Sequence, residues 1–387
     1  MSVGISKIGF FAPDEYISLA ELAEQRGVEP GKYLIGIGQE RQAVIPLSQD
    51  VVSMAANAAK TILDDEDRSS IDMILFGTET GVDNSKSAAI YLQQLLHLNS
   101  NIRTVELKQA CYGATAGLLL AKDYVTLHPD KKVLVIGADI ARYGLNTAGE
   151  VTQGGGAIAM IVSANPQILA IEDQTVHLSE DIMDFWRPLD RREAIVDGKY
   201  STEVYLRFFQ TVFEEYKTQT SLTLNDFGAL VFHLPFTKMG LKALKLVLNQ
   251  VDEENQEKLL SEFENSRRYN RQVGNLYTGS LYLSLLSLLD NTKLSEGARI
   301  GLFSYGSGAE GEFYSGLLQK NYKNHLNIAR MTEWLEQRKK ISIAQYEEVF
   351  NQALPKGEED FNIKSNVKKG QFYFAGLKDQ KRIYRAK

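Results

Sequence analysis

The chain has 387 residues, of which 44% are hydrophobic and 24% charged, and its formal net charge is −6. This composition is typical of a globular protein, and the length favours two domains or two halves of one large α/β body. The negative charge argues against a dedicated nucleic-acid binder, because such proteins need a surplus of Lys and Arg. No apolar run reaches the roughly 18 residues of a transmembrane helix, so we expect no membrane span.

The start of the chain lacks a basic segment followed by a long apolar stretch, so we expect a cytoplasmic protein. The single cysteine, Cys111, can form no internal disulfide. With one Cys and five His, no cluster has the spacing of a zinc site, and we expect no metal.

Predicted strands and helices alternate along the chain, which indicates an α/β layered fold. Buried parallel strands are predicted by four apolar runs, which begin at Ile71, Lys131, Phe227 and Ala298. The predicted helices cover 48–63, 85–96, 114–127, 201–220 and 237–248. Their candidate N-caps are Ser48, Ser85 and Ser201. The order strand, polar turn, helix occurs in both halves and hints at an internal duplication.

Four segments lie outside this alternation of strands and helices. Met183 to Ser201 predicts a long functional loop or a cap over a cleft. Glycine-rich turns at 154–156 and at 306–308 fit either tight backbone packing or a ligand. From about Asn321 the chain is more charged, and we expect a terminal helix followed by an edge hairpin around Ala375 and Gly376.

Cys111 lies in LKQACYGATAGLLLA, between a short strand-like run and a helix of small residues. This places the sulfur near a helix N-terminus, where the helix dipole and free amides favour a thiolate and can stabilise an oxyanion. A lone Cys is also a common inert core residue, so the functional interpretation depends on its neighbours.

Two further reactive side chains follow predicted strands. Glu79 ends the apolar run ILFGTET, and His233 follows ALVF. Open α/β sheets place reactive groups at the carboxyl ends of buried strands. Alone, either residue could be structural. With Cys111 they predict one cavity that holds a nucleophile, an acid or base and an imidazole.

Other polar residues leave two interpretations open. Lys238 and Lys242 share one face of the predicted helix and fit either a phosphate-binding pair or two solvated lysines. Asn275 precedes a helix of small residues, where its side chain can cap that helix or bond a substrate carbonyl.

The chain resembles the 3-hydroxy-3-methylglutaryl-coenzyme A (HMG-CoA) synthase family of the bacterial mevalonate-pathway kind. The resemblance covers nearly the whole chain and depends on the order and spacing of several motifs. They are KYLIGIGQE, FGTETGVDNSK, KQACYGATAGLLLAK, VLVIGADIARYG, DFWRP, FHLPFTKMGLKAL, RQVGNLYTGSLYLSLLSLL and IGLFSYGSGAEGEF.

The resemblance implies a thiolase-like αβαβα fold of two similar halves, 1–165 and 166–387, in a homodimer. The first half would carry Glu79 and Cys111, and the second His233, Asn275, the terminal helix and the hairpin. The implied reaction joins acetyl-CoA to acetoacetyl-CoA with water and yields HMG-CoA, in the mevalonate pathway to isoprenoids. No cofactor is implied beyond these substrates.

Residue by residue, the resemblance implies that Cys111 takes the acetyl group, Glu79 is the general acid/base and His233 orients acetoacetyl-CoA. The residues expected to line the acyl site or to face CoA are Glu29, Thr152, Ser201, Lys238, Lys242, Asn275 and Ser307. The residues expected to support the site are Tyr112, Asp139, Tyr143 and Asp184. The chemistry agrees, because an acetyl thioester becomes a carbon nucleophile only with a positioned base and donors on its oxygen.

Several alternatives remain. A decarboxylating ketoacyl synthase also has a Cys, a His and an Asn but needs no strand-end glutamate, so Glu79 discriminates against it. A degradative thiolase uses a second cysteine as base, and this chain has one cysteine only. A catalytically inactive scaffold of the same fold would lose one of the three reactive residues. A Cys/His hydrolase on another fold is also possible.

Overall fold

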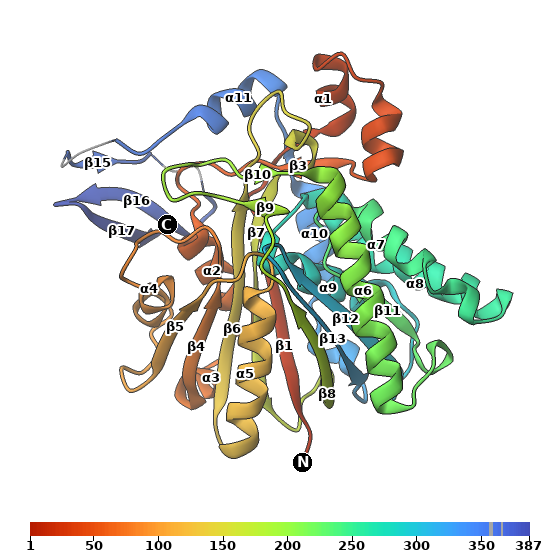
Figure 1. Ribbon diagram of the computed structural model, residues 1–387. Coiled ribbons are helices and arrows are strands. Elements are labelled where there is room, and N and C mark those ends of the chain that lie inside the picture. The colour runs from red at the N-terminus through yellow and green to blue at the C-terminus, as the bar shows by residue number, and fades with distance from the viewer. Residues whose placement is uncertain (356–358, 365–366) are drawn as a thin grey trace.

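The computed structural model describes residues 1–355, 359–364 and 367–387. Its centre is a nine-stranded mixed sheet in the order β11-β12-β13-β8-β1-β7-β6-β4-β5 (Figure 1). The strands of this sheet are β1 (Val3–Phe11), β4 (Ile71–Gly77), β5 (Arg103–Leu107), β6 (Lys132–Ala141), β7 (Gly154–Ala164), β8 (Leu169–Ser179), β11 (Ala229–Phe232), β12 (Arg299–Gly306) and β13 (Glu310–Leu318).

The two sides of this sheet repeat one arrangement. On one side β4 pairs parallel with β6, β6 antiparallel with β7, and β7 antiparallel with β1. On the other side β11 pairs parallel with β12, β12 antiparallel with β13, and β13 antiparallel with β8. The sides join where β1 pairs with β8. The expected construction from two similar halves is confirmed, and β5 is an addition to the first.

Helices cover both faces of the sheet, and α5 and α6 cross its front in Figure 1. The α-helices are α1 (Leu19–Gln25), α2 (Val51–Lys60), α3 (Asp65–Ser70), α4 (Ala88–Leu95), α5 (Gly113–Leu127), α6 (Gly198–Thr220), α7 (Thr237–Lys245), α8 (Glu253–Val273), α9 (Ser280–Asn291), α10 (Ile328–Gln337) and α11 (Ile343–Asn351). The short turns that matter below are a π-helix, η1 (Lys32–Ile37), and two 3₁₀ turns, η2 (Glu150–Thr152) and η5 (Tyr277–Gly279).

Apolar side chains on alternate positions of one strand enter different cores. Along β11, Ala229 and Val231 belong to the main hydrophobic cluster, whereas Leu230 and Phe232 belong to a second cluster with the aromatic face of α6. This alternation follows from the two-residue period of a strand, and it buries both faces of the second half of the sheet.

Three small sheets lie outside the main one. They are β14-β2-β3, made of Lys339–Lys340, Glu15–Ser18 and Arg41–Ala43; β10-β9, made of Ile195–Val196 and Phe185–Trp186; and β15-β16-β17, made of Phe361–Asn362, Phe372–Lys378 and Lys381–Ala386. In the described ranges 1–355, 359–364 and 367–387, no helix is long and apolar enough to cross a membrane.

All four predicted strands and their parallel pairing are confirmed, but three predicted N-caps are wrong. Asp50 caps α2 instead of Ser48, Ser87 caps α4 instead of Ser85, and Asp197 caps α6 instead of Ser201. In each case the side-chain oxygen of a nearby Ser or Asp accepts a hydrogen bond from a backbone amide in the first turn of the helix.

The C-terminal region contains the expected helix and hairpin, but the hairpin does not extend the main sheet. After α10 and α11, β16 and β17 form a hairpin that pairs with β15 and lies against α2. The Phe374 amide donates to the Ser48 carbonyl at 2.8 Å, and Asn57 exchanges two bonds with the Phe372 backbone. The side-chain amide of Asn57 and the backbone carbonyl of Ser48 therefore hold the hairpin against α2.

Candidate active site

Cys111 lies two residues before α5, in the turn that connects β5 to this helix. The predicted position near a helix N-terminus is therefore confirmed. The preceding residue, Ala110, has φ 42°, in the left-handed region that side chains with a Cβ rarely adopt. Such strained backbone gathers at functional sites, where packing holds it in place.

Two glycines let the strand ends approach the Cys111 turn. A Cβ on Gly77, the last residue of β4, would lie 2.3 Å from the amide nitrogen of Ala114. A Cβ on Gly306, the last residue of β12, would lie 2.4 Å from the carbonyl oxygen of Gln109. The residues that follow both strands therefore lie close to Cys111. Tight backbone packing is enough to explain why residue 306 is a glycine, without a ligand.

Glu79 is the acidic residue that contacts the cysteine. The Cys111 Sγ lies 3.5 Å from Glu79 Oε1, within hydrogen-bonding distance for sulfur. The carbonyl oxygen of Glu79 accepts a hydrogen bond from Arg187, which lies after β9. The turn that carries Glu79 is thus tied at its backbone while its carboxyl group faces the thiol.

Asp139 organises this turn from the fully buried interior of β6. Its Oδ1 accepts hydrogen bonds from the Thr78 hydroxyl at 2.9 Å, the Glu79 amide at 2.9 Å and the Thr80 hydroxyl at 2.8 Å. Its Oδ2 accepts from the amide and hydroxyl of Thr278 in η5, at 3.1 and 2.6 Å. One carboxylate therefore joins the turn after β4 to the segment before α9.

Burial and neighbouring charge raise the pKa of both Glu79 and Cys111. Burial, followed by the charge of Asp139, raises the pKa of Glu79 to about 8. Burial, followed by the charge of Glu79, raises the pKa of Cys111 above that of an ordinary thiol. Burial and the neighbouring acidic groups Glu79 and Asp139 act against the helix N-terminus, which by itself favours the thiolate. A carboxyl group with a pKa near neutrality suits proton transfer in both directions.

A cavity of about 340 Å³ opens beside Cys111. It brings together seven of the predicted site residues, namely Cys111, Tyr143, Thr152, Ser201, His233, Asn275 and Ser307. They come from elements of both halves of the fold. Cavities that hold small molecules combine an apolar lining with a few polar groups in this way.

Two buried polar atoms at this cavity have no hydrogen-bond partner among the described residues. They are Nδ1 of His233 and Nδ2 of Asn275. Burial lowers the pKa of His233 to about 3, so its imidazole is neutral near pH 7. The Oδ1 of Asn275 accepts the Tyr277 amide at 2.8 Å and the Ser280 hydroxyl at 2.8 Å. The N-cap of α9 is Gly279, so Asn275 does not cap that helix, and its bond to a substrate carbonyl stays a prediction.

The segment 183–201 covers the cavity, as predicted. Phe185 and Val196 of the β9–β10 hairpin line it. The buried Asp184 accepts hydrogen bonds from the hydroxyls of Ser201 at 3.0 Å and Tyr305 at 2.8 Å, and from the Gly308 amide at 2.9 Å. Asp184 thus holds the covering segment against the end of β12.

Seven predicted site residues lie outside the cavity lining, namely Glu79, Asp139 and Asp184 with the contacts given above, and Tyr112, Glu29, Lys242 and Lys238. Tyr112 points toward β13, where its hydroxyl donates to Glu312 at 2.5 Å. Glu29 is exposed before η1. Lys242 lies over the Phe236 ring at 5.9 Å, and that ring lines the cavity, so this lysine marks the rim. Lys238 is one turn earlier on the same face of α7.

Sequence reasoning missed other residues of the site. Arg187 contacts Glu79 and stands in the quoted motif DFWRP, but we assigned no chemistry to it. Tyr205 and Tyr305 line the cavity as well. Gln153 is buried behind Tyr143, and nothing in its local sequence pattern distinguishes it from a surface glutamine.

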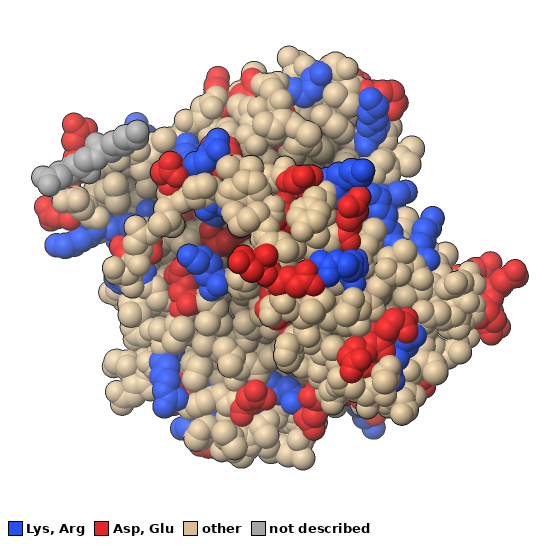
Figure 2. Space-filling model, viewed as in Figure 1, with Lys and Arg blue, Asp and Glu red and all other residues tan. Residues whose placement is uncertain are grey.

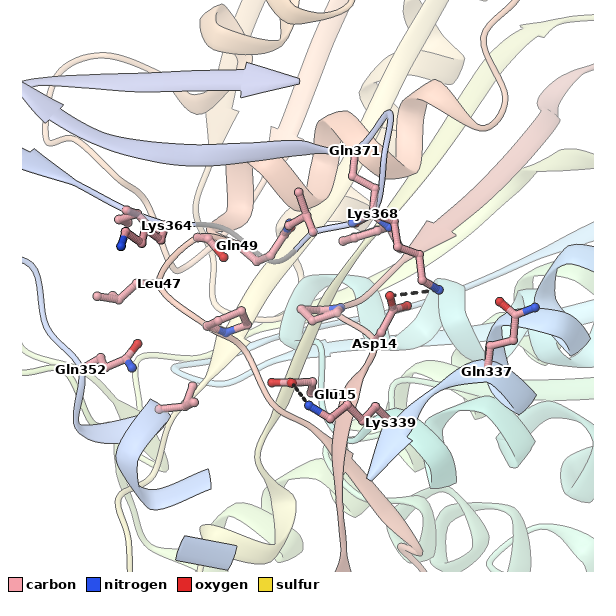
Figure 3. Close-up of a pocket in the computed structure, with 17 residues that line it drawn as sticks. Asp14, Glu15, Leu47, Gln49, Gln337, Lys339, Gln352, Lys364, Lys368 and Gln371 are labelled. Atoms are coloured by element: carbon pink, nitrogen blue, oxygen red, sulfur yellow. Dashed lines mark hydrogen bonds and ion pairs between the residues drawn. The ribbon is translucent and has the colours of Figure 1, made fainter. Parts of the chain in front are cut away.

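A second cavity, of about 520 Å³, lies between the end of β1 and the C-terminal region (Figure 3). Four of its charged groups form two ion pairs, Asp14 with Lys368 at 3.1 Å and Glu15 with Lys339 at 3.2 Å. It holds none of the predicted site residues.

Within the described part of the chain, no group of three or more His, Cys, Asp or Glu could hold a metal ion. Figure 2 shows acidic and basic side chains intermingled over one face.

Comparison with known proteins identifies the family. The family model described as hydroxymethylglutaryl-coenzyme A synthase N terminal matches residues 1–167, and the C-terminal model matches residues 171–267 and 256–387. The chain is 53% identical to the hydroxymethylglutaryl-CoA synthase of Enterococcus faecalis over 355 residues, covering 92% of this chain and 93% of that protein.

Two solved structures agree with this match. An HMG-CoA synthase complexed with CoA has a TM-score of 0.97 at 42% identity, with 100% of both chains covered. MvaS in complex with 3-hydroxy-3-methylglutaryl coenzyme A has a TM-score of 0.90 at 36% identity, with 100% of this chain and 99% of that chain covered. These similarities confirm the thiolase-like fold. The chain belongs to the hydroxymethylglutaryl-CoA synthase family, whose members condense acetyl-CoA with acetoacetyl-CoA to give HMG-CoA.

Proposed function

We propose that Cys111, Glu79 and His233 carry out this condensation in the present chain, in the mevalonate pathway. The observation that carries the proposal is the 3.5 Å contact between Cys111 Sγ and Glu79 Oε1 beside a cavity. A thiol and a carboxyl group whose pKa is about 8 form a nucleophile and base pair that can exchange a proton near neutrality.

In the first step, the ionised form of Glu79 removes the thiol proton as Sγ attacks the thioester carbon of acetyl-CoA. A carbon–sulfur bond forms to Cys111, the bond to CoA breaks, and CoA leaves as a thiol with the proton that Glu79 returns. The product is an acetyl thioester on Cys111, and Glu79 is again ionised.

In the second step, Glu79 removes a methyl proton of the acetyl group, and the resulting carbanion attacks the ketone carbon of acetoacetyl-CoA. A carbon–carbon bond forms, and the developing alkoxide takes the proton from Glu79. Neutral His233 and the free amide of Asn275 hold acetoacetyl-CoA, since both have unpartnered polar atoms. Water then cleaves the thioester, which releases HMG-CoA and restores the thiol.

We propose supporting roles for the other residues. Thr152, Ser201 and Ser307 line the acyl part of the cavity, with Tyr143 beside them. Asp139 and Asp184 hold the two segments that carry Glu79 and cover the cavity. Lys238 and Lys242 lie toward the CoA phosphates at the rim, and Glu29 lies toward the pantetheine. A solved relative that is complexed with CoA supports a CoA-linked substrate.

We further propose a homodimer in the cytoplasm, with no cofactor beyond the substrates. Residues 1–165 and 166–387 would form its two halves. Size-exclusion chromatography with light scattering measures the mass of the assembly. A mass near twice 43.3 kDa would support the dimer, and a monomer mass would contradict it.

The test of function separates acetylation from condensation. Wild type, Glu79→Ala and the exposed control Glu257→Ala receive acetyl-CoA and then acetoacetyl-CoA. Intact mass follows acetylation of Cys111, and a thiol assay follows release of CoA. We expect wild type and the control to acetylate and condense. We expect Glu79→Ala to acetylate more slowly, because solvent must then take the thiol proton, and not to condense. A wild type that never acetylates, or that condenses only with malonyl donors, would instead favour a decarboxylating synthase.

A further inference from the structure

One wall of the Cys111 cavity is built outside the main core. The wall is the segment from Tyr143 to Thr152, and Tyr143, Gly149 and Thr152 line the cavity. The apolar side chains of this segment, Leu145 and Val151, pack in a separate small cluster with α1, η1 and the C-terminal helix α11. The position of the wall therefore depends on α11, which is about 200 residues away along the chain.

Gln153 connects this wall to α11. Its Oε1 accepts hydrogen bonds from the amides of Tyr143 at 2.7 Å and Gly144 at 3.0 Å, and its Nε2 donates to the Tyr346 hydroxyl at 2.7 Å. The two backbone donors fix the orientation of the side-chain amide, since only its oxygen can accept. Gln153 and Tyr346 are 2% and 3% exposed, so water does not compete for these bonds.

A second buried contact joins the next residue of α11 to the same wall. Glu150, in η2, is 1% exposed and accepts a two-pronged hydrogen bond from Arg26 at 2.8 and 2.9 Å. The Asn146 amide also donates to Glu150, at 2.9 Å. Arg26 in turn pairs with Glu347 of α11 at 2.6 Å. Arg26 thus links the wall to α11 beside the Gln153 connection.

The two connections are adjacent and reinforce each other. Burial, followed by the charge of Glu150, raises the pKa of Tyr346, so this hydroxyl stays protonated and faces the carboxylate. At the other end, burial, followed by the nearby acidic groups Cys111 and Glu79, raises the pKa of Tyr143. A continuous chain of buried polar contacts therefore runs from α11 to a ring beside the reacting groups.

We propose that Gln153 and Tyr346 are positioning residues, which set the place of Tyr143 in the Cys111 cavity through the Tyr143 amide. The pair contacts no substrate and acts only through this backbone. A glutamine is suited to the role because one side chain must accept two amides and donate to a hydroxyl at once. This inference rests on the proposed function of Cys111.

The test compares Tyr346→Phe with Tyr216→Phe. Tyr216 is a matched control, because it is buried, its hydroxyl bonds Ser315 at 2.8 Å, and it lies in the separate cluster around α6. Each change deletes one buried hydroxyl and costs a similar stability, about 1 kcal/mol. Thermal unfolding checks that both variants fold, and steady-state kinetics gives kcat and KM for condensation.

We expect Tyr346→Phe to lower kcat about five-fold or more with KM for acetyl-CoA changed less than about two-fold, because misplaced groups at the reacting centre act on the chemical step. Tyr216→Phe should leave both within about two-fold. Gln153→Met should resemble Tyr346→Phe, and the double variant should lose little more than either alone, because both belong to one connection. Additive losses, or losses equal to the control, would overturn the inference.

The same experiment separates the inference from the proposed function. Acetylation of wild-type Cys111 by acetyl-CoA is followed by intact mass in parallel. Acetylated wild type with unaffected Tyr346→Phe overturns the positioning role alone. Unacetylated wild type overturns the proposed function and the positioning role with it. If Tyr346→Phe fails to fold, Gln153→Met, which loses the acceptor for both amides and the donor to Tyr346, takes its place with the same expected fall in kcat.

Discussion

The Sγ of Cys111 lies 3.5 Å from Oε1 of Glu79, burial raises the pKa of both groups, and the charge of Glu79 raises the pKa of Cys111 further. The pair rests as a thiol beside a largely protonated carboxyl group at neutral pH. The reactivity of the Cys111 thiol therefore depends on pH. It can be measured directly, because the chain has no other cysteine.

Alkylation of Cys111 reports the thiol pKa directly. The rate of reaction with iodoacetamide should rise with pH, with a midpoint above the ordinary thiol value of 9.0. Glu79→Gln removes a negative charge that disfavours the thiolate, so the midpoint should move to lower pH. Intact mass gives the rate for one site only. An unchanged or higher midpoint in the variant would contradict the electrostatic coupling.

Stability against pH should show the raised pKa of Glu79. The folded protein favours the protonated carboxyl group, so this contribution is complete below pH 4.5 and is lost as the pH rises through about 8. Wild type should therefore lose stability relative to Glu79→Gln across this window, by up to about 1.4 kcal/mol per pH unit. Urea unfolding at several pH values measures the difference. A constant difference would contradict the shift.

Asp139→Asn should loosen the turn that carries Glu79. The asparagine keeps one acceptor oxygen, but its NH₂ group replaces the other. That NH₂ group would face N–H and O–H donors that now bond the Asp139 carboxylate, so these buried donors would lose their acceptor. We expect a loss of about 2–4 kcal/mol in the free energy of unfolding. The variant also removes the charge that helps raise the pKa of Glu79, so the midpoint of the pH–rate profile should fall below about 8. The unfolding curve and the profile check the two effects separately.

Gly306→Ala tests the close approach of β12 to the Cys111 turn. The added Cβ would lie 2.4 Å from the Gln109 carbonyl oxygen, so the backbone must move. We expect a loss of about 1–3 kcal/mol and a reduced acetylation rate. Gly36→Ala is the control, because Gly36 is exposed and a Cβ there meets only the Gly31 carbonyl oxygen, at 3.9 Å. Equal losses of stability and acetylation rate in the two variants would contradict a role for the close contact between β12 and the Cys111 turn.

The sequence predicted those features that depend on a regular pattern. Short apolar runs located β4, β6, β11 and β12, because a run of this length is too short for a typical helix and fits a strand that is buried on both faces. N-caps were misplaced, as at Ser201, because Ser and Asp cluster near each helix start and only the three-dimensional path selects one. Ser201 instead lies within α6, where its hydroxyl donates to Asp184.

The candidate site was predictable where a reactive side chain follows a strand. Glu79 and His233 were found in this way, and their approach to Cys111 follows from the parallel pairing of strands in each half. Tyr112 was expected at the cavity, but its position at the start of α5 turns its ring toward Glu312. Gln153 and Glu150 could not be found, because their buried partners lie on α1 and α11, far away in sequence.

The repeated strand order has a consequence for how the chain can be divided. Cys111, Glu79 and the wall up to Thr152 precede the turn between Ala164 and Leu169, whereas His233 and Asn275 follow it. The reactive sulfur and the groups proposed to hold the second substrate are thus encoded on opposite sides of the repeat boundary. Two separately expressed fragments cut at that turn would each be inert, and activity would return only when they reassociated along β1 and β8.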